Sequence, residues 1–82
     1  MKVYLKPAAG SAQDNLDRAR IEMERTIGFR GKVTDAKVVG RRIIVTVEIA
    51  SQWDFPDREK DSTLRKWILA KTRRFFEVQF IK

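Results

Sequence analysis

The chain contains no cysteine and no histidine among its 82 residues, and it has only two prolines and four glycines. Without cysteine it can form no disulfide, thiolate nucleophile or zinc–thiolate site, which fits a reducing compartment. Without histidine it lacks the commonest general base and metal ligand at neutral pH. These absences predict an intracellular, cytoplasmic protein that is not an enzyme and that holds no cofactor or metal.

Other features of catalytic and membrane proteins are missing as well. No apolar run is long enough to span a bilayer, so we expect no contact with a membrane. The turn Pro7–Gly10 supplies a single glycine, too few for a phosphate-cradling loop after a first strand. The sequence has one dense group of carboxylates, formed by Asp54, Asp57, Glu59 and Asp61. Their position at the start of a predicted helix, where the helix dipole is positive, explains them better than a metal site does.

Basic residues, in contrast, are abundant. Lysine and arginine number 18 against 11 acidic residues, which gives a formal net charge of +7 and a pI near 10.3. A surplus of this size attracts polyanions and speeds encounter with them. The charge therefore predicts a polyanionic partner, either nucleic acid or an acidic protein surface.

The chain alternates patterns typical of strands with patterns typical of helices. Alternating polar and apolar residues, rich in β-branched side chains, predict four strands: Lys2–Lys6, Lys32–Val39, Arg42–Ala50 and Phe75–Lys82. Gly40-Arg41 is typical of a tight hairpin turn between the second and third strands. A second helix is expected to begin near Asp54 and Pro56 and to bury Leu64, Trp67 and Ile68.

The first helix is predicted over Ser11–Ile27. Ser11 and Asp14 resemble a capping box at its start. Gly28 should end it in a left-handed conformation, with Phe29 folding back on the last turn. One apolar stripe at three- and four-residue spacing should face the core: Ala12, Leu16, Ala19, Met23 and Ile27.

The order of these elements is β-α-β-β-α-β. That order predicts a ferredoxin-like α+β fold, in which two helices pack on one face of a four-stranded antiparallel sheet. A chain of this length has enough apolar side chains for only one hydrophobic core, so residues 1–82 should form a single compact domain.

Two helices cover only one side of four strands, which leaves the other side of the sheet open. On the predicted register the outward residues include Tyr4, Ile44, Phe75 and Ile81, which would form an apolar partner-binding patch. A protein partner or a second copy of the chain fits such a patch. Stacking of unpaired RNA bases on Tyr4 is the alternative, although the third strand offers no aromatic residue to join it.

Three groups of cations are candidates for binding nucleic acid. They are Arg30 with Lys32, then Arg41 with Arg42, and finally Lys71, Arg73 and Arg74. We expect the first and third groups to share one edge of the sheet and the second to form a separate basic finger.

These residues predict a small non-catalytic module that binds the phosphate backbone of nucleic acid through its arginine and lysine clusters. The alternative is a protein-interaction module that docks or dimerises through the open sheet face. It would be an assembly factor, a small subunit or an inhibitor of a nucleic-acid-handling protein.

Overall fold

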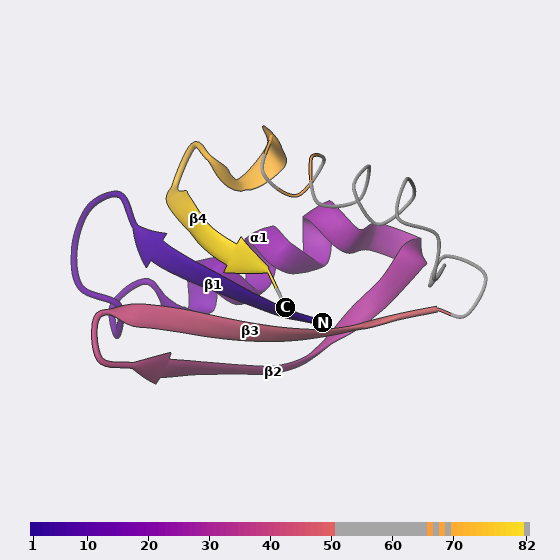
Figure 1. The fold of residues 1–82 in the computed structure, drawn as a ribbon, viewed down its shortest axis with the longest axis horizontal. Helices are drawn as coiled ribbons and strands as arrows, with labels where there is room; N and C mark the ends of the chain where they lie inside the picture. The colour runs from indigo at the N-terminus through magenta and orange to yellow at the C-terminus, as the bar shows by residue number, and fades with distance from the viewer. Residues whose placement is uncertain (51–65, 67, 69, 82) are drawn as a thin grey trace.

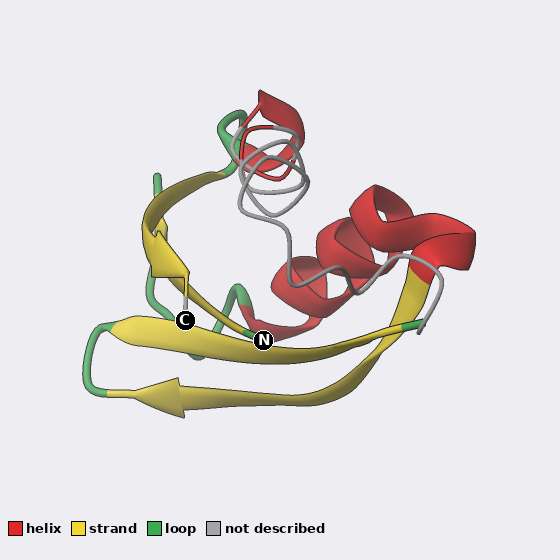
Figure 2. Cartoon of the chain, turned by 45° about the vertical axis from the view of Figure 1, so that its right-hand side comes forward, coloured by secondary structure: helices red, strands yellow, loops and turns green. Residues whose placement is uncertain are grey.

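The computed structural model describes residues 1–50, 66, 68 and 70–81. One antiparallel sheet contains four strands in the spatial order β2-β3-β1-β4. They are β1 (Lys2–Pro7), β2 (Gly31–Val39), β3 (Arg42–Ile49) and β4 (Phe76–Ile81). The helix α1 (Leu16–Ile27) and the helical residues 66, 68 and 70–72 lie on the same side of this sheet (Figures 1 and 2). The predicted α+β fold with a four-stranded antiparallel sheet is thus confirmed, while most of the predicted second helix lies outside the described residues.

The helix α1 starts later than the sequence predicts. The backbone N–H of Asp14 does donate to Ser11 Oγ at 3.1 Å, as a capping box requires. However, residues 12–15 form turns, and the regular helix begins only after Asn15. The Asn15 Nδ2 donates to the carbonyl oxygens of Ala9 (2.9 Å) and Ser11 (2.8 Å). The side chain of Asn15 therefore holds the loop after β1 against the start of the helix.

The end of α1 confirms one prediction and corrects another. Gly28 has a positive φ of 57°, and its N–H donates to the carbonyl of Glu24, so glycine ends the helix as expected. Phe29 does not fold back on the last turn, because its side chain is 72% exposed. Residues Gly28–Arg30 form a short 3-10 turn, η1, which leads directly into β2 and carries the ring away from the core.

The core lies between the sheet and α1. The predicted stripe of the helix is confirmed, since Ala12, Ala19, Met23 and Ile27 are buried and Leu16 packs against them. Ile68 is fully buried, as predicted. The sheet contributes alternate residues of its two central strands together with the first residue of β4: Val3, Leu5, Ile43, Val45, Val47 and Phe76.

Both edge strands contain a one-residue bulge that the sequence did not predict. In β2, Val33 pairs with Val47 but Asp35 pairs with Thr46, so Thr34 is extra. A shift of one residue turns every following side chain to the other face of a sheet. Strict alternation from Lys32 predicts that Ala36 and Val38 point outward, but the extra residue reverses this and both pack against the core.

The second bulge lies in β4. Tyr4 of β1 pairs with Phe80, and the next residue, Leu5, pairs with Val78, which leaves Gln79 as the extra residue. Bulges of this kind are common at sheet edges, where they re-aim side chains. The bulge turns Ile81 to the core face of the sheet.

Candidate nucleic-acid interface

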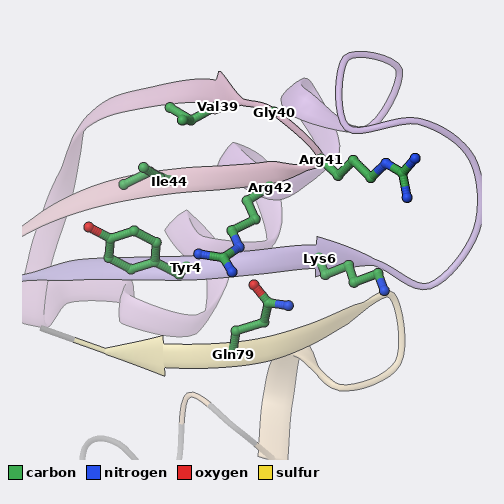
Figure 3. Close-up of a pocket in the computed structure, with 8 residues that line it drawn as sticks. All are labelled: Tyr4, Lys6, Val39, Gly40, Arg41, Arg42, Ile44 and Gln79. Atoms are coloured by element: carbon green, nitrogen blue, oxygen red, sulfur yellow. The ribbon is translucent and has the colours of Figure 1, made fainter.

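A hollow of about 420 Å³ opens at the hairpin end of the sheet, on the face opposite α1 (Figure 3). We call it the hairpin hollow. It is formed by β1, β4 and the tight turn between β2 and β3, and eight residues line it: Tyr4, Lys6, Val39, Gly40, Arg41, Arg42, Ile44 and Gln79.

The two central strands provide the apolar part of the hollow. Tyr4 of β1 pairs with Ile44 of β3, so both side chains stand on the open face. Ile44 is only 8% exposed although it lies on the face opposite α1. Val39, the last residue of β2, is 49% exposed at the rim. A ring and two aliphatic side chains thus give the hollow a partly apolar lining.

Three cations surround this apolar part. Figure 3 shows the Arg42 guanidinium extending across β1 between the Tyr4 ring and the Gln79 amide. Lys6 and Arg41 extend toward the hairpin end of the sheet. Because Gly40 has a positive φ of 63°, the chain turns within two residues, Gly40 and Arg41, and places both arginines at the hairpin end of the sheet. One acid shares this end of the open face, since Glu77 pairs with Lys6.

Gln79 supplies the amide of the hollow. It is the extra residue of the β4 bulge, and its side chain reaches the same hollow as Tyr4 and Arg42. Its Oε1 atom is buried and accepts no hydrogen bond from any residue that the structure describes. Buried acceptors are nearly always bonded in folded proteins, so this oxygen is an uncommon feature.

The predicted cations do not gather as expected. Strand pairing places Gly31 opposite Ile49, whereas Val39 pairs with Arg42 at the hairpin, so Arg30 and Lys32 lie at the end of the sheet away from the hairpin. The prediction that they share an edge with Arg73 and Arg74 is wrong. The physical reason is the direction of the strands. β2 is parallel to β1, whereas β4 is antiparallel to β1, so β2 and β4 begin at opposite ends of the sheet.

Arg73 and Arg74 lie at the hairpin end instead. They precede β4, whose first residue, Phe76, pairs with Pro7 at the end of β1. Both side chains are exposed, as is that of Lys71. The Arg74 guanidinium lies 5.3 Å from the centre of the Phe75 ring. The expected separate finger of Arg41 and Arg42 thus shares its end of the sheet with the third group of cations.

Only two of the four residues of the predicted apolar patch lie on the open face of the sheet. Tyr4 and Ile44 do face each other, but Phe75 and Ile81 are not on the open face. The Phe75 ring packs against the core and lies 4.7 Å from the guanidinium of Arg18, which belongs to α1. Ile81 pairs with Val3 and packs against the core, because the bulge at Gln79 shifts the side-chain alternation of β4 by one residue.

Sequence reasoning assigned no binding role to Lys6, Val39 or Gln79. Lys6 was recognisable from the alternation of Lys2–Lys6, which turns it to the same side as Tyr4. The alternation of Phe75–Lys82 likewise turns Gln79 outward, because Gln79 precedes the residues that the bulge shifts. Asp54 and the other residues of the predicted acidic cluster lie outside the described residues.

Within residues 1–50, 66, 68 and 70–81, no three acidic side chains are grouped so as to hold a metal ion. No helix in this part of the chain is long and apolar enough to cross a membrane. Comparison of the chain with protein-family models, with curated proteins and with solved structures finds no match. A function is therefore inferred from the geometry of the hairpin hollow.

Proposed function

We propose that the protein is a non-catalytic module that binds the phosphate backbone of nucleic acid at the hairpin hollow. The observation that carries this proposal is that Lys6, Arg41 and Arg42 line one hollow together with Tyr4. Arginine presents a planar fork of donors that matches phosphate oxygens, and lysine adds a compact charge.

The rest of the charge supports the same function in a different way. With a net charge of +7, the whole chain attracts a polyanion before any contact forms. Arg73 and Arg74, at the same end of the sheet, extend the positive field around the hollow. Arg30 and Lys32, at the other end, contribute to this long-range attraction but not to the contact.

We further propose that the fold follows a ferredoxin-like βαββαβ plan and that the protein works in the cytoplasm. The helical residues before β4 and the β2-β3-β1-β4 strand order support the first point. The lack of cysteine in the sequence supports the second.

A protein-interaction module remains the second candidate. The partly apolar lining formed by Tyr4, Ile44 and Val39 favours it, because such surfaces occur at docking sites. An acidic partner surface would then replace the phosphates. Binding through apolar area tolerates salt, whereas binding through phosphates weakens steeply with it.

Fluorescence anisotropy of labelled oligonucleotides tests the proposal. Three phosphate contacts predict a log–log slope of binding constant against salt of about −2 to −3. The double variant Arg41→Glu with Arg42→Glu should weaken binding at low salt by about tenfold or more. Its matched control, Arg20→Glu with Arg25→Glu, changes the net charge equally at exposed positions of α1 and should have a much smaller effect.

Two results would contradict the proposal. One is the absence of binding to single or double strands at low salt. The other is an equal loss of affinity in the two double variants, which would assign the binding to net charge alone and not to the hairpin hollow. Thermal melting of each variant checks that the fold is intact.

A further inference from the structure

One polar atom of the hairpin hollow has no hydrogen-bond partner in the part of the chain that the structure describes. Gln79 Oε1 is buried, and no described residue donates a hydrogen bond to it. The bulge in β4 inserts Gln79 as an extra residue, and its amide lies beside the Arg42 guanidinium on the open face (Figure 3). A buried acceptor that lines a hollow and receives no hydrogen bond from the described residues is suited to a ligand that brings an N–H group.

We infer that the hairpin hollow receives one unpaired nucleobase of a single strand. The base would stack on the Tyr4 ring, and an N–H on its edge would donate to Gln79 Oε1. This inference rests on the proposed function, in which Arg41, Arg42 and Lys6 hold the flanking phosphates. It adds a preference for single strands over duplexes.

The shape and chemistry of the hollow support a base as its occupant. A volume of about 420 Å³ falls within the range of about 300–1,000 Å³ typical of small-molecule sites. Stacking on an aromatic side chain tolerates any base, because every base has a π-face. In a duplex the faces of the bases are already stacked and their pairing edges are occupied, so a paired base can use neither Tyr4 nor Gln79.

A second copy of the chain is a poorer occupant. A symmetric dimer brings the same surface of both subunits together. Strand pairing places more cations than acids on this face, and the like charges would meet across the interface. The cations are Lys2, Lys6, Lys32, Lys37 and Arg42, and the acids are Asp35, Glu48 and Glu77.

The test compares three probes of equal length: a single-stranded oligonucleotide, the same strand with abasic positions, and the matching duplex. The abasic strand keeps the phosphates and lacks the bases. Each probe is made as DNA and as RNA, which shows whether the sugar matters. The wild type should bind the strand with bases about tenfold more tightly than the abasic strand.

Variants then assign the difference to the hollow. Tyr4→Leu should remove the preference for strands with bases, whereas Tyr4→Phe, which keeps the ring, should retain it. Gln79→Leu should reduce the preference for strands with bases over the abasic strand. If Tyr4→Leu fails to fold, Tyr4→Phe and Gln79→Leu still decide the question.

The contradicting results separate the two proposals. If the wild type binds all three probes equally, with a steep salt dependence, the inference about the base is wrong and the backbone function stands. A preference that survives both Tyr4→Leu and Gln79→Leu would also overturn the inference. If no probe binds at low salt, the proposed function fails and the inference fails with it.

Discussion

Tyr4 and Ile44 face each other across the two central strands, on the side of the sheet opposite α1. Ile44 is nevertheless 8% exposed, a value usual for a core residue. Its burial must come from neighbours on the open face itself, among them Tyr4 and the other residues that line the hairpin hollow. The open face therefore has packed side chains of its own. Substitutions of single residues on it should change binding and the free energy of unfolding by different amounts.

Exchange of Gln79 for leucine should make the protein more stable and a weaker binder. An unsatisfied buried acceptor costs about 1–3 kcal/mol, and leucine has a similar size without the polar atom. We expect the free energy of unfolding to rise by about 1 kcal/mol in urea denaturation. Gln13→Leu, at an exposed position before α1, is the control and should change stability little. A loss of stability in Gln79→Leu would mean that its amide is already satisfied.

Reversal of charge at the far end of the sheet should hardly affect binding. Arg30 and Lys32 lie at the end away from the hairpin, so Arg30→Glu with Lys32→Glu should act only through the net charge. The effect on affinity should be much smaller than that of Arg41→Glu with Arg42→Glu and should vanish as salt rises. Anisotropy at two salt concentrations measures it. Equal losses of affinity in the two double variants would contradict a binding site at the hairpin end.

Gly31 should tolerate no side chain. A Cβ atom at this position would overlap the carbonyl oxygen of Glu48 and come within 3.0 Å of the Cα of Ile49, both in the backbone of β3. Gly31→Ala should therefore separate β2 from β3 locally and cost about 1–3 kcal/mol, as forced overpacking does. Thermal melting measures the loss. Gly40→Asn is the control, because a Cβ there has open space and asparagine tolerates a positive φ.

Truncation of the helix face should test the core. Met23 is fully buried between α1 and the sheet, so Met23→Ala should lower the free energy of unfolding by about 2–5 kcal/mol. Ile21, on the same helix, is 46% exposed, and Ile21→Ala should cost far less. Urea denaturation of both variants checks the difference. Similar losses at the two positions would contradict the observed burial pattern.

The sequence predicted those elements whose signals are local. Alternation in Lys2–Lys6, the apolar stripe ending at Ile27 and the glycine at position 40 each depend on a few neighbouring residues, and all three are confirmed. The sequence predicts that α1 starts at Ser11, which is too early. Ser11 Oγ does accept a hydrogen bond from the N–H of Asp14, as in a helix cap, but Asp14 belongs to a turn that precedes the helix.

The candidate site was harder to predict because it depends on register. No residue type marks Thr34 or Gln79 as a bulge, yet each shifts the rest of its strand by one position. For this reason Ile81 was assigned to the wrong face. Arg41 and Arg42 do lie at the hairpin, as the sequence predicts, but their place in one hollow with Tyr4 depends on the pairing of β1 with β3, which periodicity alone does not give.

The two bulges also affect how copies of this protein behave when they are crowded. A regular edge strand offers a row of free backbone groups on which another chain can add a strand, and such addition leads to aggregation. Here both edge strands, β2 and β4, are interrupted by an extra residue, and β2 also carries Lys32 and Lys37. Copies of the chain that come close together should therefore remain separate proteins and not merge into a continuous sheet.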